Sequence, residues 1–206
     1  MLKIVHAAAL TVAAALLAAS PAAADPFQSF LKACVTTDGD AAAAIAAVGA
    51  LGWKAMPAEA FGEDLPAEME NVTIHLNFDP QGESAPESVE LLMTGQADGE
   101  MVLDAPSVKM DICGVVAPGA DAATLLGEAT AYLGGPPQMV DGDYTAWIYS
   151  RQNGQITLEG DLADAEDDAI LAALRERPLF AVFTLDEDGA AGLMLGAFRS
   201  TKGAAR

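Results

Sequence analysis

Side chains that commonly perform catalysis are scarce in this sequence. The chain contains two histidines, His6 and His75, and two cysteines, Cys34 and Cys113. A zinc site needs several nitrogen or sulfur ligands, and one or two histidines cannot supply them if the cysteines are oxidised. The sequence also lacks the metalloprotease, serine-hydrolase, P-loop and dinucleotide-binding motifs. We therefore expect His75, on the polar side of an alternating segment, to be a solvated surface residue and not a catalytic base.

Carboxylates are the one chemically useful group that is abundant. The chain has 30 Asp and Glu against 10 Lys and Arg, which gives a net charge of -20. Two carboxylates at a suitable separation act as acid and base in glycoside cleavage. A carboxylate-dependent hydrolase acting on envelope material is therefore one alternative function. No spacing in the sequence selects a particular pair of acids.

Four acidic clusters have the composition of a cation site. They are Asp38 to Asp40, Asp141 to Asp143, Asp164 to Asp168 and Asp186 to Asp188. The last of them comes nearest to a calcium loop, but with Gly189 at the sixth position the bidentate glutamate of the twelfth is replaced by Leu195. We expect these clusters to be hairpin turns and helix caps, and we predict no metal and no cofactor.

The first 24 residues have the layout of a secretory signal peptide. Lys3 supplies the positive end, an apolar stretch runs from Ile4 to Ala19, and Ala22 to Ala24 forms the cleavage site. The apolar stretch is shorter than the ~20 residues of a membrane-spanning helix. We predict a mature chain of residues 25–206 that is periplasmic or secreted and has no stable membrane insertion. Loss of Lys3 makes its net charge -21.

The two cysteines predict a disulfide bond. In an oxidising compartment an even number of cysteines pairs, and Cys34 with Cys113 is the one pairing available. Cys34 lies at helical spacing from Phe27 and Phe30, so its sulfur is on an apolar helix face. The absence of a C-x-x-C motif favours a structural bridge over a redox-active pair. We expect it to join the first helix to a strand that ends at Cys113.

Apolar side chains recur at helical spacing in four segments, which predict helices over 27–35, 41–51, 122–133 and 166–177. Thr37 to Asp40 caps the second helix, and Pro118 to Asp121 starts the third. Alternation predicts eight strands, over 72–78, 88–94, 100–104, 107–113, 144–151, 155–159, 179–185 and 191–199. Turn sequences, of which Asn153-Gly154 is the strongest, separate three pairs of these strands.

These elements predict an α+β fold. We expect one domain, with an antiparallel sheet of about eight strands in hairpins and three or four helices packed on it. We expect residues 54–71 to form a loop with one turn of helix. A predicted internal repeat gives a second interpretation. Cys34 and Cys113 are each followed by a helix, by glycine at the end of that helix and by a proline, and the distance from cysteine to proline is the same in both cases. The chain would then consist of two α-then-β halves, 34–112 and 113–199.

Two segments resemble a known group of proteins. Residues 30–53, with Cys34, a Thr-Asp-Gly-Asp cap and an Ala-rich helix ending in Gly-Trp, are similar to the opening of small exported proteins of Gram-negative, especially alphaproteobacterial, bacteria. Residues 113–136 are similar to a second such element. These proteins carry no assigned activity. The resemblance covers about a quarter of the chain and implies export and a disulfide, but it transfers no catalytic residue.

The charge favours a non-enzymatic binding or inhibitory protein for a cationic protein partner. A negative field attracts cations and disfavours nucleic acid. Acidity for solubility alone is the plainer interpretation, and an accessory subunit of an envelope complex is a third function. Trp147 and Tyr149 share a strand face and form either an exposed platform or part of the core. The candidate interaction residues are Asp164, Glu166, Asp167, Asp168, Trp147 and Tyr149.

Overall fold

The computed structural model describes residues 25–61, 69–78, 89–103, 105–141, 144–187 and 189–201. The expected signal peptide, residues 1–24, lies outside these ranges. The helices are α1 (Pro26–Phe30), α2 (Ala41–Gly49), α3 (Ala122–Leu133) and α4 (Asp167–Glu176), with a π-helical turn η1 (Leu31–Val35) and the 3-10 turns η2 (Ala58–Ala60), η5 (Gly99–Met101) and η6 (Gly160–Leu162). The strands are β1 (Lys54–Met56), β2 (Glu70–Asn77), β3 (Glu90–Asp98), β4 (Val108–Pro118), β5 (Met139–Asp141), β6 (Tyr144–Gln152), β7 (Gln155–Leu158), β8 (Leu179–Glu187) and β9 (Ala190–Ser200).

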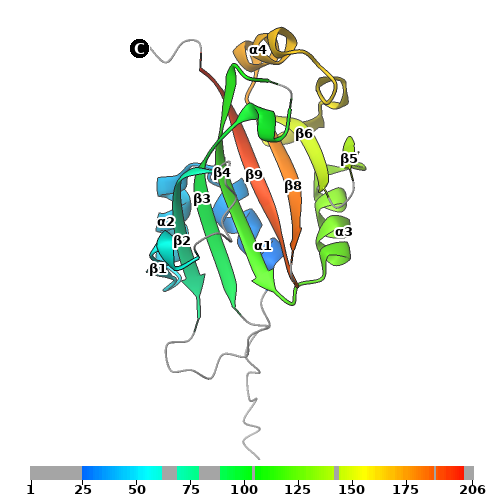
Figure 1. Ribbon diagram of the computed structural model, residues 1–206. Coiled ribbons are helices and arrows are strands. Elements are labelled where there is room, and N and C mark those ends of the chain that lie inside the picture. The colour runs from blue at the N-terminus through cyan, green and yellow to red at the C-terminus, as the bar shows by residue number, and fades with distance from the viewer. Residues whose placement is uncertain are drawn as a thin grey trace, which may run out of the picture.

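The predicted α+β fold is confirmed. All nine strands form one antiparallel sheet in the order β1-β2-β3-β4-β9-β8-β6-β5, and β7 pairs with a different stretch of β6 from β5. The central pair, β4 with β9, is in register along its whole length, from Val108 opposite Ser200 to Pro118 opposite Ala190. Helices α1, α2 and α3 lie behind the sheet in Figure 1, and α4 lies at its upper end.

The predicted helix caps explain where the helices begin. The carboxylates of Asp40 and Asp121 accept hydrogen bonds from the backbone N–H groups of Ala43 and Thr124. These bonds satisfy donors that the first helical turn leaves free. The third helix ends at Gly134, whose φ of 80° is the left-handed conformation that glycine adopts without steric cost.

Two strand predictions and one loop prediction need correction. Of the expected strand 100–104, the described residues 100–103 are not a strand, because β3 continues to Asp98 and η5 follows in a tight turn, where Gly99 lies too close to Ala105 and Val108 to accept a side chain. Val102 and Leu103, apolar residues of the expected strand, are buried in this connection. Strand β4 does not end at Cys113 but continues to Pro118. The expected loop 54–71 contains strand β1, which pairs with β2.

The disulfide Cys34–Cys113 is present, and both cysteines are fully buried. It joins η1 to the middle of β4, with 5.3 Å between the two Cα atoms. The predicted helix 27–35 consists of an α-helical turn followed by a π-helical turn, in which the Thr36 N–H donates to the carbonyl of Leu31. The bridge fastens this N-terminal segment to one of the two central strands.

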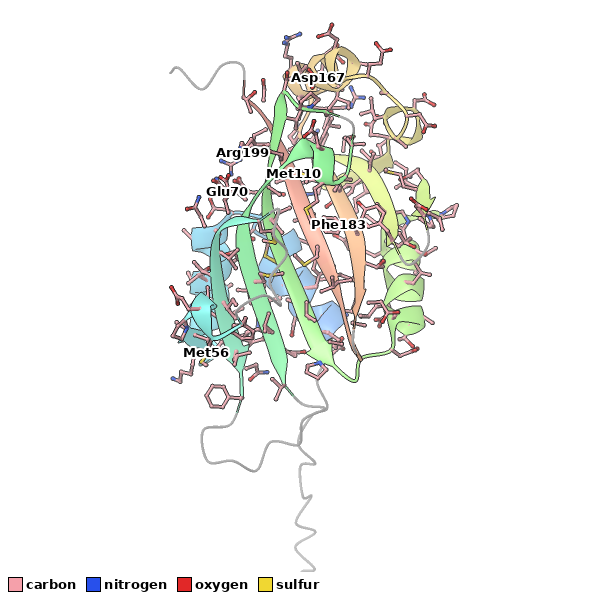
Figure 2. All side chains as sticks on the ribbon, in the orientation of Figure 1. Met56, Glu70, Met110, Asp167, Phe183 and Arg199 are labelled. Carbon is pink, nitrogen blue, oxygen red and sulfur yellow. A yellow bond between two sulfur atoms is a disulfide. The ribbon has the colours of Figure 1, made fainter. Side chains whose placement is uncertain are left out.

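The sheet separates two apolar cores. The core behind the sheet joins its helices to Cys113, Trp147 and Tyr149. The core on the face toward the viewer contains Met110 and Phe183, labelled in Figure 2, together with side chains of α4. A chain of this length can bury enough apolar surface to form a core on each face of the sheet.

A continuous row of cross-strand partners crosses the viewer's face. It runs Met56, Ile74, Met93, Gly114, Met194, Phe183, Ala146, Met139. Cross-strand partners point to the same side of a sheet. We call this side the methionine face, because its core cluster also contains Met69 and Met110, and Met101 packs against it.

The two halves of the sheet come from the two halves of the chain. Strands β1 to β4 follow α2, and β5, β6, β8 and β9 follow α3. Cys34 lies in a helical turn, whereas Cys113 lies within a strand. The internal repeat stays a prediction.

Within the described ranges, no helix has the length and apolarity to cross a membrane.

Candidate functional site

The acidic segment 159–168 connects β7 to α4. Asp161, Asp164, Glu166 and Asp168 are exposed, and within the described ranges none of them has a side-chain hydrogen bond or an ion pair. Asp167 differs, because its carboxylate accepts a hydrogen bond of 3.0 Å from the Ser107 N–H. Among the candidate acidic residues, Asp167 therefore fixes the segment to the β3–β4 connection, and Asp164, Glu166 and Asp168 face solvent.

Packing and one ion pair hold this segment in place. Leu162 and Ile170 are buried in the core of the methionine face. The guanidinium of Arg177 donates to both carboxylate oxygens of Glu159, at 2.7 and 2.8 Å. These bonds lower the pKa of Glu159 and raise that of Arg177. The exposed carboxylates thus project from a fixed support, near the end of the molecule where Asp167 lies in Figure 2.

The aromatic candidates are buried, so the interpretation of them as an exposed platform is wrong. Trp147 and Tyr149 have relative exposures of 0% and 1%, so neither can contact a partner. Their strand face is covered by α3, and the Trp147 indole donates to the Gly135 carbonyl just beyond that helix. The Tyr149 ring stacks on Phe180, and burial raises the pKa of its hydroxyl. The core interpretation of these residues is the right one.

A polar hollow of about 270 Å³ lies between the N-terminus of α2 and the sheet. Its floor is Asp111, 7% exposed, which pairs with Arg199 and accepts a hydrogen bond from Gln96. Asn71 extends this network by donating to Gln96, and Asp40 also lines the hollow. The sequence analysis missed this network, because its members are far apart in the chain and carry no motif.

A second buried acid was also missed. Glu90 is 3% exposed, and its Oε2 accepts hydrogen bonds from Ser29 and Asn77, while its Oε1 has no partner. His75 is half-buried, its Nδ1 has no hydrogen bond, and burial lowers its pKa. Since the Ser29 hydroxyl donates to Glu90, it does not form with His75 the serine–histidine pair that nucleophilic catalysis requires.

Among the other acidic clusters, Asp38 to Asp40 has structural roles, whereas Asp143 and Asp188 lie outside the described residues. Asp38 forms an ion pair with Arg151, and Asp40 caps α2. Asp186 lies next to the turn between β8 and β9. In the part of the chain that the structure describes, no group of three or more acidic, histidine or cysteine side chains has a geometry suited to a metal ion.

Comparisons with known protein families, with curated protein sequences and with solved structures give no match to this chain. The resemblance to small exported proteins of Gram-negative bacteria therefore stays a prediction.

Proposed function

We propose that this protein is an exported, non-catalytic binding protein for a cationic protein, and that the acidic segment 159–168 is its contact surface. The observation that carries the proposal is the set of exposed carboxylates without cationic partners in that segment. Asp161, Asp164, Glu166 and Asp168 lie within eight residues and share no Lys or Arg.

The pairing of the basic residues supports this choice of surface. Lys109, Arg151, Arg177 and Arg199 are each bound to at least one carboxylate. Arg175 is in the last turn of α4, away from the exposed carboxylates at its start. The exposed carboxylates of segment 159–168 therefore have none of these cations as a partner, unlike those of Asp38, Asp98 and Asp111. A negative surface of this kind accelerates encounter with a cationic partner.

The hydrolase alternative has less support. The two carboxylates that line the polar hollow are both engaged, Asp40 with the N-terminus of α2 and Asp111 with Arg199 and Gln96. An acid–base pair needs one protonated and one ionised carboxyl group aimed at a common substrate atom. Glu90, the other buried acid, lies beneath α1 and does not line that hollow.

The test compares two triple variants with the same change in net charge. One is Asp161→Asn, Asp164→Asn, Glu166→Gln, which leaves Asp168 in place because an acid in the first turn stabilises α4. The matched control is Glu59→Gln, Asp141→Asn, Asp186→Asn, at exposed positions elsewhere. Each protein, immobilised, is exposed to a periplasmic extract, and captured proteins are identified and their association rates measured.

We expect the wild type and the control to capture the same basic protein, with an on-rate that falls as salt rises. The segment variant should lose most of that on-rate and change the off-rate less. An acidic partner, binding that is indifferent to salt, or equal losses in the two triple variants would contradict the proposal. In those cases the acidity is a property of the whole surface and segment 159–168 is not a site.

A further inference from the structure

The polar hollow beside α2 lies over four adjacent strands of the sheet. One wall is the first turn of α2, and the others come from β2, β3, β4 and β9. Its volume of about 270 Å³ is just below the roughly 300 Å³ at which pockets for small organic ligands begin. The hollow therefore has room for a small molecule with a single ring.

The strand side of the hollow is a chain of hydrogen bonds that leads to a buried acid. The Asn71 side-chain amide donates to the Gln96 carbonyl at 3.3 Å, and the Gln96 amide donates to Oδ1 of Asp111 at 3.1 Å. Oδ2 of Asp111 is paired with Arg199 but accepts no hydrogen bond, and this side chain is only 9% exposed. A buried carboxylate oxygen without a hydrogen bond is unfavourable, so a ligand that donates to Oδ2 is stabilised there.

The backbone of Asn71 places its amide beside Gln96. Its φ of 54° is left-handed, which is uncommon for a residue other than glycine. Asn71 lies where the register of β2 and β3 shifts, between Glu70 and Thr73. Such irregularities re-aim side chains and are concentrated near functional sites. This conformation is independent of the cavity and points to the same place.

The walls of the hollow hold donors and acceptors side by side. Among the described residues, the first-turn N–H groups of Ala41 and Ala42 have no hydrogen bond. Arg199 has a side chain that is 59% exposed, and its pair with Asp111 uses one end of a group with five N–H donors. The acceptors on the walls are the carboxylates of Asp40 and Asp111 and the side-chain carbonyl of Asn71.

This mixture discriminates between classes of ligand. An anion only accepts hydrogen bonds, and the carboxylates of Asp40 and Asp111 repel it. An ammonium ion only donates hydrogen bonds, and Arg199 repels it. A hydroxyl group both donates and accepts, so neighbouring hydroxyls of one neutral molecule can use the donors and the acceptors together.

We propose that the hollow binds a neutral sugar, as one pyranose ring with several adjacent hydroxyl groups. The hydroxyls donate to Asp111 and Asp40 and accept from Arg199 and from the N-terminus of α2. Binding is weak, with a Kd in the millimolar range, because the hollow is open and none of its lining residues is aromatic. The hollow shares no residue with segment 159–168, so the sugar site and the proposed function can fail separately.

Nuclear magnetic resonance titration of the ¹⁵N-labelled mature chain tests the proposal. Glucose, galactose and N-acetylglucosamine are each added from about 1 to 100 mM. We expect at least one sugar to give saturable shifts of the Ala41 and Ala42 N–H signals and of the side-chain amides of Asn71 and Gln96. Methylammonium and acetate, which carry one of the two excluded charges each, should bind at least about tenfold more weakly.

Two variants with matched controls locate the site. Ala42→Leu fills the hollow without removing a hydrogen bond and should lower the affinity at least about tenfold, whereas Ala46→Leu, exposed on the same helix but outside the hollow, should leave it unchanged. Gln96→Ala breaks the chain of hydrogen bonds and should weaken binding about threefold to tenfold. Gln155→Ala, exposed on β7, is its control. Thermal unfolding shows that each variant is folded.

Three results would overturn the proposal. The first is the absence of saturable shifts at the hollow with all three sugars. The second is binding of methylammonium or acetate as tight as that of the sugars, which would make the hollow an ion site. The third is an equal loss of affinity in Ala42→Leu and Ala46→Leu, which would place the bound sugar elsewhere.

Discussion

The two faces of the sheet are filled by different side chains. The face behind the sheet in Figure 1 is fixed by a covalent bond, Cys34–Cys113, and by rigid rings, among them Trp147 and Tyr149. The methionine face uses flexible thioethers, and two of them, from Met194 and Met110, occupy the space above glycines of the central strands. Packing on the first face depends on rigid groups of fixed shape. On the methionine face, flexible methionine side chains fill the space above glycines.

This difference has a physical cause in the elements that cover each face. The short α1 and η1 have little apolar surface to hold them, and the bridge fixes them to β4. On the methionine face α4 covers only one end of the sheet, where Arg177 and Glu159 fasten it. We therefore expect loss of the disulfide to destabilise the first face most, and changes in side-chain volume to destabilise the methionine face most.

Removal of the disulfide should have the largest effect on this comparison. Replacing both cysteines, Cys34→Ser with Cys113→Ser, should lower the free energy of unfolding by about 2–5 kcal/mol, because the closed loop between them spans 79 residues. Urea denaturation followed by circular dichroism measures the change. Wild-type protein denatured in reductant serves as the control. A variant as stable as the oxidised wild type would show that apolar packing alone holds α1.

Filling the space above Gly114 should have the next largest effect. A Cβ at that position overlaps the Met194 sulfur and lies 3.1 Å from the Leu193 carbonyl, so Gly114→Ala should cost about 1–3 kcal/mol. In a Met194→Ala background the same substitution should cost less, because the sulfur is absent. A double-mutant cycle of unfolding free energies measures this coupling. Additive effects would mean that Met194 moves away freely.

Breaking the Arg177–Glu159 pair should cost about 1–2 kcal/mol at neutral pH, because both ends are mostly buried and the contact is bidentate. The pKa of Glu159 in the folded state is lowered from its ordinary 4.5, so the pair stabilises the fold above that value. The stability difference between wild type and Arg177→Gln should shrink as pH falls from about 4.5 through the folded pKa. Urea denaturation across acidic pH checks the sign, and a difference that grows on acidification would contradict it.

The smallest effect is expected for Tyr149→Phe. The Tyr149 hydroxyl is buried without a hydrogen bond, so its removal relieves an unpaired polar group and keeps the stacked ring. The free energy of unfolding should change by less than about 1 kcal/mol, in the stabilising direction. Phe180→Leu, which removes the stacking partner, is the matched comparison and should destabilise. A loss of stability in Tyr149→Phe would reveal a hydrogen bond to bound water.

Local signals in the sequence determined much of the fold. Asp40 and Asp121 begin helices because a carboxylate caps the first turn, and Gly134 ends one because it adopts a left-handed conformation. Asn153-Gly154 forms a hairpin, with φ angles of 51° and 79°. The disulfide followed from the number of cysteines in a chain expected to be exported. Each of these features depends on neighbouring residues or on simple counting.

Only the tertiary structure decided which strand faces are covered and which distant groups meet. Alternation places Trp147 and Tyr149 on one side of a strand, but it does not say that α3 covers that side. Asp111 and Arg199 meet because β4 and β9 pair, and no local pattern encodes that register. The same holds for the exposure of α2, which depends on what packs against it. Burial is a property of the assembled layers, whereas caps and turns are properties of a few consecutive residues.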